Sequence, residues 1–586
     1  MTTETSSPPE APPQSYYDDI KRKFAQERDL RLGYRPEGTS QYTSDLTGDF
    51  AKYEIDPHLR ELEPRAPITD AVEVLFIGGG FSALLTAARL RERGVKSIRI
   101  VERGADVGGT WYWNRYPGAA CDVPSYDYLP LLDEMGVVPP RYYAQGPEIF
   151  AHCQAIARRY DLYDLAVFST TVTQTIWDDE AKLWRIGTDR GDAMRAKFVI
   201  CANGTLSKPK LSKILGMERF KGHSFHTSRW DYDYTGSDLS RLQDKMVGII
   251  GTGASAVQVI PRLARNARAL YVFQRTPSSI DIRNDRPTRP EWIEKLAPGW
   301  QQARRMKHLR GPEGEAERKA ALDELSREEK IRRQENGNID YMMRIHRRID
   351  EIVEDRDTAQ ALKPWYMFMC KRPCFDDEYL PAYNRPGVHL IDTHGKGVSE
   401  ISEQGVVFEG RTWPLDCLIY ATGFEVQKTG IYNRIVGKTG REINETYADG
   451  IRTLFGVHSH GYPNLFIMGG YQASFQFNLT FMLQCQGDHI AECIKLAREG
   501  GHDEIDVSPE TEEWWVQEVI AHRGKTSRNA DCTPGYYNFE GEFNRRQDGN
   551  YNGGFARYYA HMQDIRGELA KHFVFGRKIP SPLDRN

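Results

Sequence analysis

The stretch Val74-Leu75-Phe76-Ile77-Gly78-Gly79-Gly80-Phe81-Ser82-Ala83 decides how the first half of this chain folds. A short apolar run ends in glycines, and apolar residues at helical spacing then continue to Arg93. Ile98-Arg99-Ile100-Val101 follows as a second apolar run. A strand, a Gly-rich turn, a helix and another strand in this order predict a β-α-β unit of a parallel sheet.

The turn inside this unit has the form G-x-G-x-x-A, from Gly78 to Ala83. The first Gly permits a tight turn, the second lets a pyrophosphate approach the backbone, and the small last residue lets helix and strand pack closely. The helix N-terminus then offers free N–H groups to the phosphates. Glu102 ends the next strand, where a carboxylate accepts hydrogen bonds from a ribose diol. We predict a dinucleotide site; a Gly-rich turn with a purely structural role is the alternative. The residues expected at this first site are Gly78, Gly80, Phe81, Ser82 and Glu102.

A second β-α-β pattern begins at Met246 and carries Gly251-Thr252-Gly253-Ala254-Ser255-Ala256 between its strand and its helix. At the end of its next strand, Gln274-Arg275-Thr276 replaces the carboxylate. A guanidinium there suits the 2′-phosphate of NADP(H), although a surface ion pair would explain Arg275 too. The residues expected at this second site are Gly251, Thr252, Gly253, Ala254, Ser255, Gln258, Arg275 and Thr276.

Two such loops in one chain suggest hydride transfer between two bound dinucleotides. Two nicotinamides would give no net redox chemistry, so we expect FAD at the first loop and NADPH/NADP+ at the second. The strand from Asp416 ends in Ala421-Thr422-Gly423, which resembles the motif that links the two domains in flavoproteins of the disulfide-reductase class, and Ala202-Asn203-Gly204 is a variant of it. The expected fold class is α/β, with two Rossmann-like domains of that architecture. The reductases themselves are disfavoured, because no redox-active cysteine pair is present.

Between the loops, Phe220-Lys221-Gly222-His223-Ser224-Phe225-His226-Thr227-Ser228-Arg229-Trp230-Asp231 resembles the fingerprint F-x-G-x-x-x-H-x-x-x-W-[PD] of type I Baeyer–Villiger monooxygenases. Gly108-Gly109-Thr110-Trp111, Arg115-Tyr116-Pro117-Gly118 followed by Asp122, and Lys371-Arg372-Pro373 also look like that family. These motifs and both loops stand in family order from about Ala71 to Gln486. Departures are Ala83 and Ala256 in place of glycines and Asp231 in place of the commoner proline.

The resemblance implies an enzyme that uses NADPH and O2 to convert ketones to esters or lactones through a flavin C(4a)-peroxide. A fixed cation beside the flavin would keep the peroxide deprotonated and stabilise the tetrahedral intermediate, and Arg372 is the candidate, paired with Asp122. An ion pair that merely docks two domains is the alternative for these two residues. Lys371 would reach the 2′-phosphate of NADP. The resemblance adds Gly109, Thr110, Trp111, Asp122, Tyr128 and Val172 to the FAD site.

Two interpretations are possible for the fingerprint residues Phe220, Gly222, His226, Trp230 and Asp231. The resemblance makes them a linker that couples domain movement to catalysis, whereas a packed core histidine and tryptophan would look the same in sequence. Heteroatom monooxygenases that oxidise amines or sulfides share both loops and are the alternative enzyme class. An NADP-sensing regulatory protein is the non-enzymatic alternative.

The expected domains are an N-terminal extension (1–70), a discontinuous FAD-binding domain (71–215 and 386–530), an NADP-binding domain (216–385) and a C-terminal lid or wrapping segment (531–586). A helical insertion in the NADP domain is expected over about 290–362. Residues 1–15 are rich in Pro, Ser and Thr, and we expect them to be disordered. The extension is similar to that of members acting on large cyclic ketones, so a bulky cyclic ketone is the expected substrate.

Composition and charge limit the binding partners and the cellular location that we expect for this chain. A net charge of −4 gives no reason to expect nucleic acid or a membrane surface as a partner, and no apolar run approaches the ~20 residues of a membrane helix. The N-terminus lacks the features of a secretory signal. We expect a cytoplasmic monomer or weak homo-oligomer without a metal. We interpret the nine cysteines as reduced thiols: Cys121, Cys153, Cys201, Cys370, Cys374, Cys417, Cys485, Cys493 and Cys532.

Overall fold

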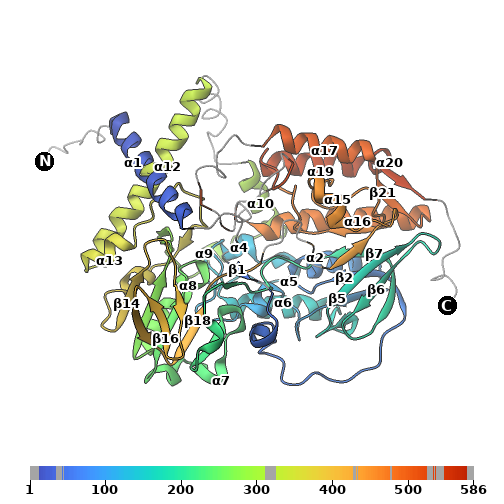
Figure 1. The fold of residues 1–586 in the computed structure, drawn as a ribbon. Coiled ribbons are helices and arrows are strands. Elements are labelled where there is room, and N and C mark those ends of the chain that lie inside the picture. Colours follow the sequence, from blue (N-terminus) through green and yellow to red (C-terminus); the bar gives the residue numbers. More distant parts are fainter. Residues whose placement is uncertain are drawn as a thin grey trace.

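The computed structural model describes residues 12–34, 42–43, 45–310, 325–425, 431, 433–474, 478–523, 532–533, 535, 537 and 547–576. Two lobes are visible, each built on its own sheet (Figure 1). The predicted disorder of residues 1–15 falls mostly outside the described residues. Of the expected C-terminal lid or wrapping segment (531–586), the structure describes residues 532–533, 535, 537 and 547–576, and a role as a lid stays a prediction. No helix in the described part of the chain combines the length and apolar character that crossing a bilayer requires.

The first lobe contains an eight-stranded mixed sheet whose centre is the predicted β-α-β unit. β2 runs parallel between β3 and β7, and α2 (Phe81–Glu92) connects β2 to β3. In spatial order the strands are β19 (Arg434–Val436), β5 (Val172–Asp178), β6 (Leu183–Thr188), β7 (Ala193–Cys201), β2 (Ala71–Ile77), β3 (Ile98–Val101) and β4 (Ala166–Val167), with β20 (Leu465–Ile467) beside β7. The apolar runs that predicted β2 and β3 are buried in this sheet, as expected for parallel strands.

The second lobe contains a five-stranded parallel sheet around the second predicted unit. In spatial order the strands are β14 (Val388–Asp392), β11 (Ala269–Gln274), β10 (Met246–Ile250), β18 (Cys417–Tyr420) and β9 (His223–His226), with α8 (Ala254–Asn266) after β10. We expected the chain to return to the first domain at 386. β14 and β18 instead complete the second sheet, and the return comes only at β19.

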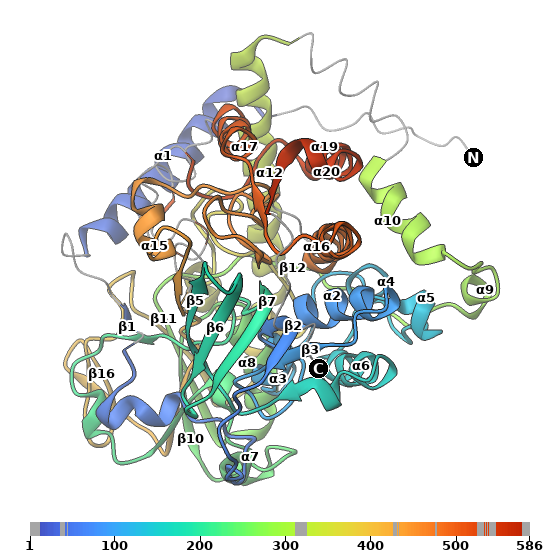
Figure 2. The ribbon, with the colours of Figure 1, turned by 90° about the vertical axis from the view of Figure 1, so that its right-hand side faces the viewer.

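The predicted helical insertion divides between the two lobes. α9 (Pro290–Ile293) leads into α10 (Trp300–Arg310), which packs against α4 (Ser125–Tyr128) and α5 (Leu132–Met135) of the first lobe (Figure 2). The Arg304 Nε and Nη2 atoms each lie 2.8 Å from a carboxylate oxygen of Asp127. α12 (Arg327–Ile352) and α13 (Arg356–Ala361) stay with the second lobe, and helix α1 (Gln14–Gly33) of the N-terminal extension packs on α12.

Helices α16 (Leu479–Gly500), α17 (Pro509–Ala521) and α19 (Phe555–Gly567) gather on the first lobe (Figure 1). α16 packs directly on α2, where Gly487 lies so close to Thr86 that an added Cβ would stand 2.7 Å from its Oγ1. This contact braces the helix that follows the first Gly-rich loop.

Candidate functional site

The first Gly-rich loop has the geometry that its sequence predicted. Gly78 has φ +106°, and a Cβ there would lie 2.6 Å from the carbonyl oxygen of Ala202, so only glycine fits the turn. α2 begins directly after Gly80, with no side-chain cap and no acidic residue in its first turn. Its N-terminal N–H groups, among them those of Phe81 and Ser82, are therefore suited to an anion such as a pyrophosphate.

Glu102 is buried beneath this loop. Its Oε2 accepts a hydrogen bond from the Gly79 N–H at 2.6 Å, and its Oε1 accepts one from the Gly104 N–H at 2.7 Å. Burial raises the pKa of Glu102, although both backbone N–H groups favour the carboxylate. Glu102 thus fixes the loop itself, and the further lone pairs of its oxygens can still accept hydrogen bonds from a ribose diol.

The second loop repeats the turn. Gly251 has φ +109°, and an added Cβ would lie 2.6 Å from the Ala421 carbonyl oxygen. Thr252 closes the loop, because its Oγ1 donates to the Thr276 carbonyl oxygen at 2.7 Å. α8 begins at Ala254, again without a side-chain cap or an acidic first turn, and Ser255 follows in that turn. The chemistry of this site also suits an anion.

Two residues predicted to bind NADP make other contacts as well. The Gln258 amide nitrogen donates to the Ala120 carbonyl oxygen at 2.9 Å, and its oxygen accepts from the Tyr116 hydroxyl at 2.9 Å. Gln258 therefore joins the two lobes. Arg275 follows β11, and its Nη2 donates to the Tyr42 hydroxyl of the N-terminal extension at 2.7 Å.

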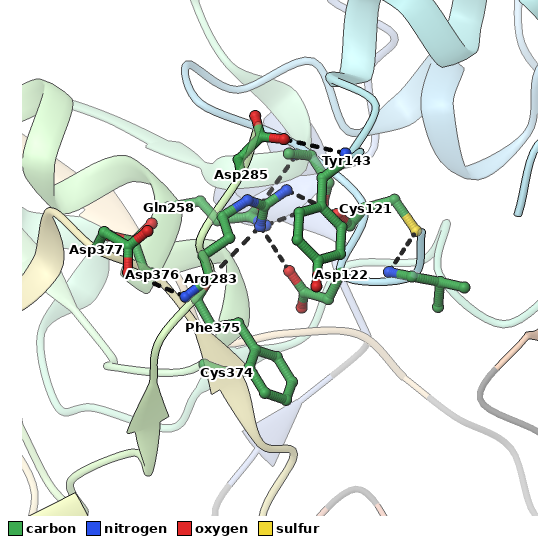
Figure 3. Close-up of polar contacts among 12 residues, drawn as sticks. Cys121, Asp122, Tyr143, Gln258, Arg283, Asp285, Cys374, Phe375, Asp376 and Asp377 are labelled. Atoms are coloured by element: carbon green, nitrogen blue, oxygen red, sulfur yellow. Dashed lines mark hydrogen bonds and ion pairs between the residues drawn. The ribbon is translucent and has the colours of Figure 1, made fainter. Parts of the chain in front are cut away.

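The structure brings Asp122 and Arg372 together, as the sequence predicted, but it adds a third residue. Asp122 of the first lobe is mostly buried between two guanidinium groups of the second lobe. Arg283 Nη1 lies 2.8 Å from Asp122 Oδ1, and Arg372 Nη2 lies 3.4 Å from Oδ2. Figure 3 shows Arg283 directed at both Asp122 and the Cys121 backbone, whose carbonyl oxygen accepts from Arg283 Nη2 at 2.7 Å.

Arg283 is the residue that sequence reasoning missed. It lies beyond β12 (Ile280–Asp281), in a run of alternating charges that is not specific for any site. The Asp377 carboxylate accepts the Arg283 backbone N–H at 3.0 Å, and the guanidinium carbon stands 4.8 Å from the centre of the Tyr143 ring. These contacts hold Arg283 in place as a rigid partner of Asp122.

One carboxylate between two guanidinium groups leaves one positive charge in excess. Arg283 is the closer and more buried of the two partners, with 10% of its side chain exposed, against 50% for Arg372. Burial acts to lower the pKa of Arg372, but Asp122 outweighs it and the pKa rises above its usual value. Arg372 is therefore permanently charged and is the cation of this cluster that remains open to an anion.

Aromatic residues line the neighbouring part of the first lobe. Trp111 Nε1 donates to the Tyr128 hydroxyl at 2.9 Å, and the two rings pack edge to face with Phe81 nearby. Gly109 lies against the first loop, because a Cβ on it would stand 2.8 Å from the Gly80 Cα. Thr110 starts the helix that carries Trp111, and Val172 starts β5, where it is buried.

Of the fingerprint residues, His226 and Trp230 are buried in the second lobe, whereas Phe220, Gly222 and Asp231 are partly exposed. His226 ends β9, and its Nδ1 lies 2.8 Å from Ser228 Oγ, while burial lowers its pKa to about 3. Trp230 is 1% exposed and donates to Thr235 Oγ1 at 3.1 Å. The Asp231 side chain caps the short helix α7 (Tyr232–Thr235). The Phe220 ring lies against Gly222. These contacts are those of a structural core, and a coupling role stays a prediction.

The interpretation of all cysteines as reduced thiols is wrong at one pair. Cys370 and Cys532 form a disulfide, which ties the segment carrying Lys371 and Arg372 to the C-terminal part of the chain. Their sequence separation of 162 residues hid the pair, because spacing motifs detect only short-range pairs. Lys371 lies beside the same segment, since a Cβ on Gly535 would stand 2.9 Å from its Nζ. The other seven cysteines are free and buried.

Residues 75–336 match the family model for pyridine nucleotide-disulphide oxidoreductases. The chain is 45% identical over 558 residues to neopentalenolactone D synthase of Streptomyces avermitilis, covering 89% of this chain and 92% of that one. It is 42% identical over 580 residues to a Baeyer–Villiger monooxygenase of Streptomyces coelicolor, covering 94% and 95%.

Solved structures agree with these relatives. A polycyclic ketone monooxygenase from Thermothelomyces thermophila superimposes with a TM-score of 0.89 at 36% identity, over 97% of this chain and all of that one. A structure described as OTEMO in complex with FAD and NADP gives a TM-score of 0.73 at 26% identity, over 87% of this chain and all of that one. The chain belongs to the Baeyer–Villiger monooxygenases, oxidoreductases that insert one oxygen atom beside a ketone carbonyl.

Proposed function

We propose that this chain binds FAD at the loop of Gly78 to Ala83 and NADP(H) at the loop of Gly251 to Ala256, and that Arg372 acts directly on the reacting oxygen atoms. Both loops present an uncapped helix N-terminus, which is the donor set that a pyrophosphate needs. Glu102 at the first loop and Arg275 at the second favour a free ribose diol and a 2′-phosphate respectively.

The observation that carries the proposal is the charge balance around Asp122. Arg283 neutralises this carboxylate at 2.8 Å, so the charge of Arg372 is in excess. Without Arg283, Asp122 and Arg372 would form a neutral pair of the kind that only docks domains. Asp122 and Arg283 are mostly buried, whereas half of the Arg372 side chain is exposed, so its charge is the one that an anion can reach.

Reduced FAD, when bound, supplies the activated oxygen for the insertion. Arg372 then holds the negative charge that develops on oxygen as the ketone carbonyl is attacked, in the manner of an oxyanion hole. Asp122 orients Arg372 and prevents its guanidinium from turning away. The aromatic residues Trp111 and Tyr128 close one side of this region and keep water out, which favours oxygen transfer over loss of hydrogen peroxide.

A bulky, fused-ring ketone is the substrate class that the relatives support. Two of the most similar proteins are described as neopentalenolactone D synthase and polycyclic ketone monooxygenase. A panel from cyclohexanone to tetracyclic ketones, with product mass measured for a gain of one oxygen, tests this class. Higher kcat/KM for the smallest ring than for any fused-ring ketone would contradict it. A monomer or weak homo-oligomer in the cytoplasm stays a prediction.

The role of Arg372 is tested with Arg372→Ala. Loss of one charge-stabilising donor costs about 100- to 1,000-fold in rate, so ketone oxidation should fall by at least that factor. Flavin reduction by NADPH, followed anaerobically by absorbance, should continue because the dinucleotide loops are intact. Retention of ketone oxidation in Arg372→Ala would refute the proposal.

Arg286→Ala is the matched control for this variant. Arg286 lies close to the same lobe boundary but stacks on the Tyr142 ring, 3.9 Å from its centre, and no contact with Asp122 is found among the described residues. Its ketone oxidation should stay within about twofold of the wild type. Sulfide oxidation by Arg372→Ala is measured in parallel. Attack on a sulfide does not need the cation that ketone oxidation needs, so sulfide oxidation should persist while ketone oxidation is lost.

A further inference from the structure

The two guanidinium groups that flank Asp122 are carried by one short ribbon of two strands. β12 pairs parallel with β13 (Cys374–Phe375). Arg283 lies two residues after β12, and Arg372 lies two residues before β13. The alignment of the two strands therefore sets where both guanidinium groups stand relative to the carboxylate between them.

Helix α12 holds both strands of this ribbon, which is marginally stable by itself because of its length. The guanidinium of Arg348 on α12 donates from Nη1 to the Ile280 carbonyl oxygen at 3.3 Å and from Nη2 to the Asp376 carbonyl oxygen at 3.1 Å. Ile280 belongs to β12, and Asp376 directly follows β13. Arg348 thus ties the two strands together with one planar group.

The same guanidinium braces the turn that carries Arg283. Arg348 Nη2 lies 3.6 Å from Asp377 Oδ1. The Asp377 carboxylate accepts the backbone N–H groups of Arg283 at 3.0 Å and of Asn284 at 2.8 Å, and Figure 3 shows it against the Arg283 backbone. Only 13% of the Arg348 side chain is exposed, and within the described part of the chain it contacts neither Asp122 nor Arg372.

A second arginine of α12 fixes β12 alone. Arg344 donates from Nη1 and Nη2 to the two carboxylate oxygens of Asp281, at 3.1 Å and 2.5 Å. The Tyr341 hydroxyl donates to the same carboxylate at 2.8 Å. Arg344 therefore anchors one strand to the helix, whereas Arg348 joins the two strands to each other.

We infer that Arg348 is a positioning residue for the oxygen insertion: it clamps β12 to β13, so that Arg283 stays on Asp122 and the charge of Arg372 stays aligned with the reacting oxygen atoms. A guanidinium presents a planar fork of donors that can span two carbonyl oxygens in a fixed geometry, which the single ammonium group of a lysine does not reproduce. A misplacement of about 1 Å at the reacting groups can cost about 100-fold in rate. The inference rests on the proposed role of Arg372.

The test uses the full-length, FAD-loaded enzyme and compares ketone with sulfide oxidation in each variant. Arg348→Ala should lower kcat for the ketone about 10- to 100-fold, because the alignment of Arg372 is lost. Its sulfide oxidation should stay within about threefold of the wild type, since that reaction does not need the cation, and flavin reduction by NADPH within about twofold. Arg348→Lys keeps the charge but not the fork, so it should lower ketone oxidation at least about fivefold.

Arg347→Ala is the matched control. Arg347 is the preceding residue on α12, and its side chain is exposed. Both activities of this variant should stay within about twofold of the wild type. Flavin content and melting temperature are measured for all variants, and Arg348→Lys supplies the same comparison if Arg348→Ala is recovered without flavin.

The outcomes separate the inference from the function beneath it. If Arg372→Ala retains ketone oxidation, the proposed role of Arg372 fails and the inference fails with it. If Arg372→Ala loses ketone oxidation but Arg348→Ala keeps it within twofold, only the inference is wrong. Equal loss of ketone and sulfide oxidation in Arg348→Ala also overturns it, because Arg348 would then act on the fold as a whole. A fully active Arg348→Lys protein overturns it too, because the fork would then be dispensable.

Discussion

The two Gly-rich loops of this chain have nearly the same backbone but different surroundings. Gly78 and Gly251 have φ +106° and +109°, and each would place a Cβ 2.6 Å from the carbonyl oxygen of an alanine, Ala202 or Ala421. The glycines before the helices also match, with φ −81° at Gly80 and −78° at Gly253. The same motif has therefore folded twice into the same turn.

What covers each loop differs. A Cβ on Gly80 would meet the Gly109 backbone at 3.4 Å, whereas a Cβ on Gly253 would meet nothing within 4 Å among the described residues. Glu102 turns inward to hold the first loop, and Arg275 reaches out to Tyr42. An enclosed loop suits a resident group, and an open loop suits a coenzyme that arrives and departs in each cycle. The motif alone does not make this distinction; the packing around it does.

Gly78→Ala should have the largest effect on this comparison. The left-handed backbone costs a non-glycine residue about 1–3 kcal/mol, and the overlap with Ala202 adds to it. We expect protein without flavin, measured by the ratio of flavin to protein absorbance. Gly94→Ala is the control, because Gly94 has φ +77° but open space around it, and it should retain flavin. A fully loaded Gly78→Ala protein would show that the enclosed turn is not required.

Cys370→Ser tests whether the disulfide between Cys370 and Cys532 stabilises the folded protein. A disulfide closing a loop of 162 residues stabilises by up to about 5 kcal/mol in the chain-entropy model. We expect the melting temperature to fall by several degrees, and Cys532→Ser should lower it equally. A reductant should lower the melting temperature of the wild type and leave both variants unchanged. An unaffected wild type would mean that the bond is not formed in solution.

Gly253→Ala sharpens the contrast with Gly80→Ala. The fold should accept a methyl group at Gly253, so the protein should bind flavin normally. The methyl group would, however, keep the pyrophosphate of NADPH from approaching the backbone, and NADPH binding should weaken about tenfold, or about 1.4 kcal/mol. Gly80→Ala should instead reduce flavin content, because its methyl group would stand where the pyrophosphate of FAD approaches the backbone. Flavin loss from Gly253→Ala and normal flavin content in Gly80→Ala would reverse the assignment of the two loops.

Acid should destabilise both lobes through buried imidazoles. Burial lowers the pKa of His58, whose ring packs edge to face on Tyr112 of the first lobe, to about 4, and that of His226, in the second sheet, to about 3. The unfolded chain binds a proton at each site below about pH 6.5 while the folded protein does not. Stability is therefore complete above pH 6.5 and falls by at most about 1.4 kcal/mol per pH unit and histidine below it. Urea unfolding from pH 8 to 5 measures the slope, and His226→Gln should reduce it; an unchanged slope would contradict the assignment.

Local patterns predicted much of the fold because they report local physics. The apolar runs and helical spacing around Gly78 and Gly251 correctly indicated β2, α2, β3, β10, α8 and β11. Asp122 and Arg372 were paired through a family resemblance, and their side chains do meet. Sequence did not indicate that β14 and β18 belong to the second sheet, because strand order depends on pairing between distant segments.

By itself, the sequence determined that this chain folds into two dinucleotide-type units, since turn geometry and apolar periodicity depend on neighbouring residues. Only the tertiary structure decided that Arg283 neutralises Asp122, that Cys370 bonds to Cys532 and that Tyr42 meets Arg275. These partners are separated by 161, 162 and 233 positions. Contacts over such separations arise when packed sheets bring distant chain segments together. The spacing of residues within a short sequence motif cannot predict them.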